Sequence, residues 1–161
     1  MIEIKPITGT INAIITVPGS KSYTNRALIT AALANGESTI TNALFSDDTK
    51  YMASGLNILG IPIEEQQDAN RFVVHGKGGI IPVNQANLFI GNAGTAMRFL
   101  TAMLTLGNGV YEIDGVIRMR QRPIQDLLDG LRQLGAGVVS KNNDGCPPVV
   151  IQGKGLNGGL A

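Results

Sequence analysis

Two short polar stretches combine hydroxyl groups, glycines and a cation, which are the groups that bind an anion. Residues 18–26 read Pro-Gly-Ser-Lys-Ser-Tyr-Thr-Asn-Arg, and residues 91–98 read Gly-Asn-Ala-Gly-Thr-Ala-Met-Arg. Each stretch runs directly into a long apolar segment, so each is expected to present backbone N–H groups, hydroxyls and an arginine at a helix start. Two such stretches in one chain predict a site for a polyanionic small molecule.

Each stretch carries a pair of residues spaced at i and i+4, which places both on one face of a helix. The pairs are Ser22 with Arg26 and Gly94 with Arg98. A cation on an otherwise buried helix needs a partner, because an uncompensated buried charge costs several kcal/mol. An anionic ligand is one such partner, and an internal ion pair with the acidic residues 47–48 is the alternative.

Further candidates lie beside these pairs. Lys21 precedes the first helix, and a flexible ammonium suits a phosphate or carboxylate that is bound and then released. Gly94 lacks a Cβ and permits close approach of a ligand, whereas Asn92 taken alone is better explained as an ordinary helix cap. Arg122 is fixed by the following Pro123 and is the best candidate for bidentate binding of a carboxylate or phosphate.

Other reactive residue types do not form convincing sites. Asp47 and Asp48 are explained by the start of a helix, and His75 is expected to be structural. Cys146 has no surrounding nucleophile motif, and Arg118 is expected to be solvated. No spacing of metal ligands occurs in the sequence, so no metal is expected.

Composition limits the class of protein. The 161 residues carry a net charge of +1, contain 43% apolar residues and include a single cysteine. The near-neutral charge and the scarcity of aromatic residues argue against nucleic-acid binding, and no apolar run approaches the ~20 residues of a membrane helix. Without a secretory signal or a disulfide framework, a cytoplasmic protein is expected.

Hydrophobic periodicity predicts alternating helices and strands. Four helices are expected, over 22–34, from 46 or 47 to 59, over 94–106, and from Pro123 to 134. Strands are expected over 2–7, 11–17, 37–44, 61–65, 71–75, 88–90, 110–116, 137–141 and 148–152.

These elements form an internal repeat. Leu59-Gly60 recurs as Leu134-Gly135, and Gly76-Lys-Gly78 recurs as Gly153-Lys-Gly155. The pattern predicts an α/β (α+β) chain with N-terminal strands over 1–17 and βαβαββ units over 18–78 and 79–155. A truncated start of a third unit is expected over 156–161, which makes the chain a fragment of a longer protein.

The motifs resemble those of the 5-enolpyruvylshikimate-3-phosphate (EPSP) synthase family. Residues 18–28, residues 91–98 and the segment Arg120-Gln-Arg122-Pro-Ile resemble three signatures of that family, in the same order. The resemblance covers nearly the whole chain and corresponds to the N-terminal part of the enzyme. It implies two globular halves, each built from three βαβαββ units with helices inside and sheets outside.

The resemblance also implies an activity and a set of roles. The family transfers the enolpyruvyl group of phosphoenolpyruvate to shikimate 3-phosphate, in aromatic amino acid biosynthesis, without metal or organic cofactor. Shikimate 3-phosphate would be held by Lys21, Ser22 and Arg26. Phosphoenolpyruvate, and glyphosate as inhibitor, would be held by Lys21, Asn92, Gly94 and Arg122. Lys21 would be catalytic, and the residues expected to shape the site are Asp48, Thr95 and Arg98.

Two departures from the family pattern bear on function. Phe99 stands where many members carry proline, which leads us to hypothesise altered glyphosate sensitivity. The downstream half of the site is missing, so we expect no turnover by this chain alone and expect residues 1–17 to pack with the missing C-terminal part. Two alternatives stay open: a non-catalytic anion-binding βαβαββ module, and a relative of the enolpyruvyl transferase acting on UDP-N-acetylglucosamine.

Overall fold

From its first helix onward, the first unit follows the predicted order of elements, but among the residues that the structure describes it lacks the strand that was predicted before that helix. A computed structural model describes residue 4 and residues 6–160. Helix α1 (Lys21–Leu33) begins at Ser20, whose hydroxyl accepts from the N–H of Tyr23. The unit continues with the elements β1 (Asn35–Ile40), α2 (Asp47–Ile58), β2 (Ile63–Gln66), the 3-10 turn η1 (Gln67–Ala69) and β3 (Arg71–Lys77).

Helix α2 has the start that the sequence predicted. Ser46 is its N-cap, and its hydroxyl accepts from the N–H of Thr49 while the Thr49 hydroxyl accepts from the N–H of Ser46. Asp47 and Asp48 follow in the first turn, where carboxylates interact favourably with the helix dipole. The interpretation of this acidic pair as a helix start is therefore confirmed.

The second unit repeats this order and adds a strand before it. Its elements are β4 (Gln85–Phe89), α3 (Gly94–Leu104), β5 (Asn108–Asp114), the 3-10 turn η2 (Met119–Gln121), α4 (Gln125–Gln133), β6 (Gly137–Ser140) and β7 (Val149–Lys154). Pro123 was predicted in the first turn of α4, but Ile124 is the N-cap of that helix, so Pro123 lies just outside it.

The two sheets differ by one strand. The first has the order β1-β3-β2, and both of its pairs are antiparallel. The second has the order β4-β5-β7-β6, in which β5-β7-β6 repeats the first sheet and β4 pairs parallel with β5. Strand β4 is therefore an addition at one edge of the second sheet.

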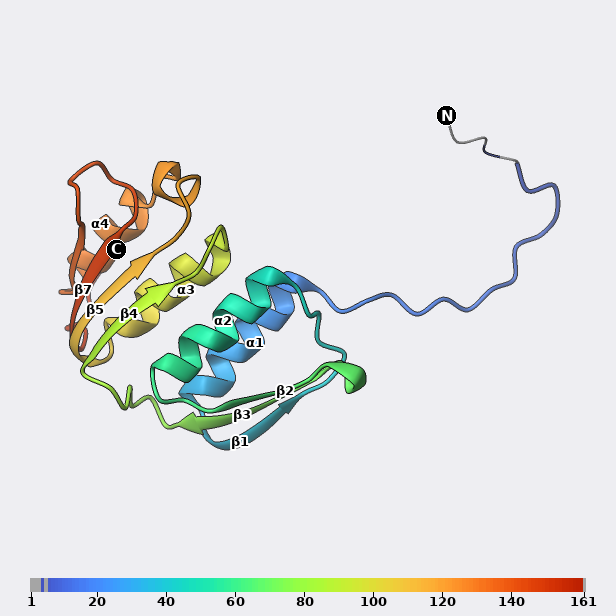
Figure 1. Ribbon diagram of the computed structural model, residues 1–161, viewed down its shortest axis with the longest axis horizontal. Coiled ribbons are helices and arrows are strands. Elements are labelled where there is room, and N and C mark those ends of the chain that lie inside the picture. The colour runs from blue at the N-terminus through green and yellow to red at the C-terminus, as the bar shows by residue number, and fades with distance from the viewer. Residues whose placement is uncertain (1–3, 5, 161) are drawn as a thin grey trace.

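Helices from both units share one core. Helix α1 contacts α2 and α3, α2 contacts α3, and the two sheets cover this helical layer from outside (Figure 1). The side chains at the centre are fully buried and come from all three helices: Leu28, Met52, Leu56, Met97 and Leu100. The predicted arrangement, with helices inside and sheets outside, is confirmed.

The N-terminal segment does not form the predicted strands. Residues 11–17 have no strand pairing, and the same holds for residues 4, 6 and 7, whereas residues 2, 3 and 5 lie outside the described residues. Figure 1 shows this segment running away from the two units. Its apolar side chains are exposed, including Ile7, Ile11, Ile14, Ile15 and Val17. The prediction of a strand over 11–17 is therefore wrong, because a strand forms only where a neighbouring strand completes its backbone hydrogen bonds.

Within the described residues, no helix is long and apolar enough to cross a membrane.

Candidate anion-binding site

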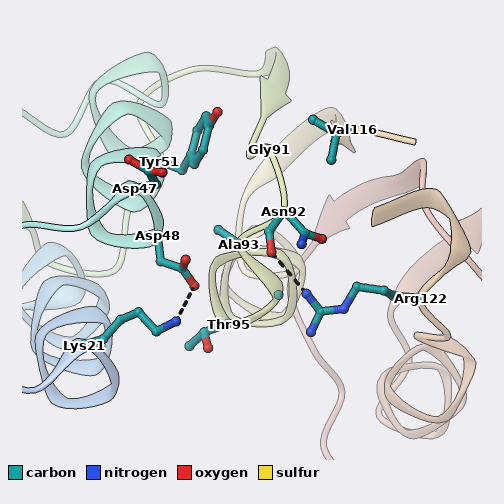
Figure 2. Close-up of a pocket in the computed structure, with 11 residues that line it drawn as sticks. Lys21, Asp47, Asp48, Tyr51, Gly91, Asn92, Ala93, Thr95, Val116 and Arg122 are labelled. Carbon is teal, nitrogen blue, oxygen red and sulfur yellow. Dashed lines mark hydrogen bonds and ion pairs between the residues drawn. The ribbon is translucent and has the colours of Figure 1, made fainter. Parts of the chain in front are cut away.

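The two units meet at a polar cavity of about 530 Å³. Its wall comes from the start of α1, the first turns of α2, the residues that lead into α3, and the segment that follows β5. Figure 2 shows Lys21 and Arg122 pointing toward this space from opposite sides, with the start of α3 between them. The lining residues are Lys21, Asp47, Asp48, Tyr51, Gly91–Thr95, Val116 and Arg122.

Lys21 is the cation that the first unit contributes. Its ammonium lies 3.3 Å from the Asp48 carboxylate, and 48% of the Lys21 side chain is exposed to solvent. An ammonium has three donors, so one carboxylate leaves donors available to a second acceptor. Asp48 therefore holds Lys21 at the cavity and shares its charge with any anion that enters.

The second unit contributes the start of α3. Its N-cap is Ala93, and no side chain caps the helix. Among the described residues, no hydrogen bond engages the N–H of Gly94 or Thr95. Asn92 was weighed as a helix cap, and this alternative is wrong, because its side chain lies on the cavity wall. The helix thus presents bare amides to the cavity, and helix N-termini favour anions.

Arg122 reaches the cavity over Gly94. Its Nη1 donates to the Asn92 carbonyl oxygen at 3.1 Å. A Cβ built on Gly94 would lie 2.7 Å from the Arg122 Cζ atom, which is closer than real Cβ contacts come. The absent side chain at position 94 therefore lets the guanidinium lie directly against the helix start.

An ion pair supports the segment that carries Arg122. The Arg120 guanidinium binds the Asp114 carboxylate through both Nε, at 2.9 Å, and Nη2. The hydrogen bonds from Arg120 are the largest cause that lowers the pKa of Asp114. Since Asp114 ends β5 and Arg120 lies in η2, the pair fixes the path of the chain just before Arg122.

Three predicted residues lie outside the cavity. Ser22 and Arg26 share one exposed face of α1, where Arg26 Nη1 donates to the Ser22 carbonyl at 3.1 Å. Arg98 donates to the carbonyls of Gly94, at 3.2 Å, and Pro123, at 3.0 Å. These bonds tie the first turn of α3 to the segment before α4, and the role of Arg98 in shaping the site stays a prediction. The ligand roles of Ser22 and Arg26 stay predictions.

Tyr51 and Val116 line the wall without having been predicted, and Gly91 was predicted only as part of the stretch 91–98. Tyr51 lies one turn after Asp47 and Asp48 on the same face of α2, so the helical spacing could have identified it. Gly91 has a positive φ of 55°, and a Cβ there would lie 2.7 Å from the Tyr51 hydroxyl oxygen. The position of Val116 on the wall could not be predicted from its residue type, because it depends on the path of the turn after β5.

The cavity combines charges of both signs with free donors. Lys21 and Arg122 face it together with the carboxylates of Asp47 and Asp48, and the ammonium is paired with Asp48. The guanidinium and the bare amides at the start of α3 remain as donors. Among the described residues, no group of His, Cys, Asp or Glu side chains is arranged to hold a metal ion.

Taken together, the fold and the cavity define an α/β protein of two repeated units, αβαββ in the first and βαβαββ in the second, which places two cations and an uncapped helix start around one cavity. The sequence profile of the family described as EPSP synthase (3-phosphoshikimate 1-carboxyvinyltransferase) matches residues 5–160. The chain therefore belongs to the EPSP synthase family.

Individual relatives agree with this assignment. The chain is 51% identical over 159 residues to the 3-phosphoshikimate 1-carboxyvinyltransferase of Shewanella denitrificans, covering 98% of this chain. It is 49% identical over 158 residues to the protein of that name from a Nostoc species. The fold matches an EPSP synthase from Acinetobacter baumannii with a TM-score of 0.81 and 30% sequence identity, over 87% of this chain and 32% of that one.

The chain spans 37% of the length of these two curated relatives. The match supports the resemblance to EPSP synthases over the alternative resemblance to the transferase acting on UDP-N-acetylglucosamine.

Proposed function

We propose that this chain supplies one side of the active site of an enzyme that transfers the enolpyruvyl group of phosphoenolpyruvate to shikimate 3-phosphate. The observation that carries the proposal is the convergence of Lys21, Arg122 and the bare amides of Gly94 and Thr95 on one cavity. These groups come from both units, and each donates hydrogen bonds to anions.

Phosphoenolpyruvate is assigned to this cavity. Its carboxylate and phosphate need separate groups of donors, which Arg122 on one side and Lys21 on the other provide. Asn92, Gly94 and Thr95 line the wall between them. Asp48 holds Lys21 in place, and Arg98 fixes the first turn of α3.

Shikimate 3-phosphate is assigned to the adjoining face of α1, where Ser22 and Arg26 are exposed and Lys21 begins the helix. The hydroxyl group of shikimate 3-phosphate loses its proton as its oxygen adds to C2 of phosphoenolpyruvate. The C2–C3 double bond opens and C3 gains a proton, which gives a tetrahedral intermediate. Loss of phosphate from C2 and of a proton from C3 then restores the double bond. Lys21 is the catalytic contact in this proposal, because an ammonium stabilises the negative charge on the phosphate as it leaves.

The remainder of the enzyme is part of the proposal. We assign to a C-terminal part the cover of the cavity and the packing partner of residues 6–17, whose apolar side chains are exposed. The chain alone is then expected to release no phosphate from the two substrates. A cytoplasmic location and inhibition by glyphosate at the phosphoenolpyruvate cavity complete the proposal.

Titration of the isotopically labelled chain with phosphoenolpyruvate, followed by NMR, tests the assignment of the cavity. We expect saturable shifts of the Gly94 and Thr95 amides, which Arg122→Gln weakens and Arg118→Gln leaves unchanged. Arg118 is a matched control, because it is an exposed arginine of the same segment that does not line the cavity. Equal binding by both variants, or no response at these amides, contradicts the proposal.

A further inference from the structure

A second contact between the units involves Arg26, a residue outside the polar cavity. The Arg26 guanidinium carbon lies 5.5 Å from the centroid of the Phe99 ring, over its face. Arg26 belongs to α1 and Phe99 to α3, so the contact bridges the two inner helices. The two side chains border a hollow of about 320 Å³ together with Ile29 and Thr30.

The contact with Phe99 is what fixes the Arg26 head group relative to α3. The hydrogen bond of Arg26 to Ser22 stays within α1. Within the described residues, Arg26 has no carboxylate partner, so its charge and most of its N–H donors are uncompensated. Arginine has high rotamer entropy, and a cation held over an aromatic ring loses that freedom before any ligand arrives.

Arg98 shows the other way in which this chain fixes an arginine. Two backbone carbonyls, those of Gly94 and Pro123, accept from its guanidinium and use its donors. A ring face instead restrains the cation and leaves the N–H donors at its edge available. An arginine held in this way is suited to accept a ligand with two or more oxygens.

We propose that Phe99 is a positioning residue that holds the Arg26 guanidinium ready for an anionic substrate group. The inference rests on the proposed function, in which Arg26 binds shikimate 3-phosphate. Phe99 itself makes no contact with the substrate in this account. Loss of the ring is expected to weaken binding of shikimate 3-phosphate by about two- to five-fold, which corresponds to the strength of an exposed cation–π contact.

The first measurement tests the contact without any ligand. In NMR spectra of the chain, protons of the Arg26 side chain over the ring are expected to shift upfield through the ring current. Phe99→Tyr keeps this shift, Phe99→Leu abolishes it, and Ile29→Val, which alters the same hollow, leaves it in place. Arg26 resonances at their ordinary positions in the unchanged chain would overturn the proposal.

The second measurement tests the consequence by titrating shikimate 3-phosphate into the chain and its variants. We expect the Phe99→Leu variant to bind two- to five-fold more weakly and the Phe99→Tyr variant to bind like the unchanged chain. In an Arg26→Ala background, Phe99→Leu is expected to have no further effect, because the ring acts through the arginine. Thermal unfolding of each variant separates loss of the contact from loss of the fold.

The outcomes separate this inference from the proposed function. If Phe99→Leu binds as tightly as the unchanged chain while Arg26→Ala binds more weakly, the positioning role is wrong and the proposed function stands. If Phe99→Leu weakens binding equally with and without Arg26, the ring acts in some other way and the inference is overturned. If no variant binds shikimate 3-phosphate, the proposed function of this chain fails and the inference falls with it.

Discussion

The two repeated units share one order of elements and contribute different groups to the site. The first unit supplies Lys21 from α1 and the carboxylates that begin α2. The second supplies the uncapped start of α3 and, after β5, Arg122. The repeated scaffold thus places equivalent helices side by side. The groups that differ between the two helix starts are the ones that give the cavity its chemistry.

The two sheets also differ between the units, by the presence of one edge strand. Strand β4 pairs parallel with β5 at the edge of the second sheet, whereas β1 has no such neighbour among the described residues. The segment before α1 occupies the matching place in the order of elements, but its described residues are exposed. The second unit is therefore complete within this chain, and the first has one edge of its sheet uncovered.

The largest expected effect tests whether the units fold as one body. Leu100 of α3 is fully buried and approaches α2, because a Cβ built on Gly55 would lie 3.1 Å from its Cδ1 atom. Leu100→Ala is expected to lower the free energy of unfolding by about 2–5 kcal/mol. Denaturant unfolding should show one transition for both units. Two separate transitions would mean that the shared core does not couple them.

Gly94→Ala tests the start of α3 in the second unit. The added methyl group would meet the Arg122 guanidinium, the flexible end of a side chain, so we expect the guanidinium to be displaced and the fold to survive. Binding of phosphoenolpyruvate should weaken by roughly tenfold, which corresponds to about 1.4 kcal/mol. Calorimetric titration measures the change.

Gly130→Ala is the matched control for this variant. Gly130 lies inside α4, and no atom lies within 4 Å of a Cβ built there. Alanine in an exposed helix interior is expected to stabilise the protein by up to about 1 kcal/mol relative to glycine and to leave binding unchanged. Equal weakening by both variants would exclude a specific role for the approach of Arg122 to Gly94.

The sequence was sufficient to predict the repeat and most of the element order, because hydrophobic spacing and glycine stops are local signals. The layer arrangement was predicted only through the resemblance to the EPSP synthase family. The sequence also pointed to Lys21, Gly94 and Arg122, which line the cavity. A lysine, an arginine and a glycine at a helix start can be recognised as candidate anion ligands from their residue types alone. The sequence did not show that Arg26 lies over Phe99, because that contact depends on how α1 packs against α3. The strand over 11–17 failed for a similar reason, since alternation predicts a strand without supplying its neighbour.

Asp114→Asn tests, with a smaller effect, how the second unit holds the segment before Arg122. Arg120 lowers the pKa of Asp114, so the ion pair stabilises the folded state at pH above the ordinary Asp pKa of about 3.9. This stabilisation is lost as the pH falls through the lowered pKa. The difference in unfolding free energy between the unchanged chain and the variant should therefore be largest near neutral pH and should disappear at acidic pH.

Measurements of unfolding free energy against pH check this expectation. In an Arg120→Gln background, Asp114→Asn should have little further effect, because the pair is then already broken. If the difference in unfolding free energy does not depend on pH, the variant acts through packing and not through the ion pair.

The smallest expected effect concerns the segment before the first unit. Deletion of residues 1–17 should leave the unfolding temperature unchanged, because the described residues of this segment pair with no strand and expose their apolar side chains. Leu88→Ala in β4 is the contrasting variant, since Leu88 is 2% exposed and its loss should cost about 2–5 kcal/mol. If the deletion lowers the unfolding temperature as much as Leu88→Ala does, the segment acts as a fourth strand of the first sheet. The difference between the units would then disappear, and with it the reason to assign residues 6–17 to a partner outside this chain.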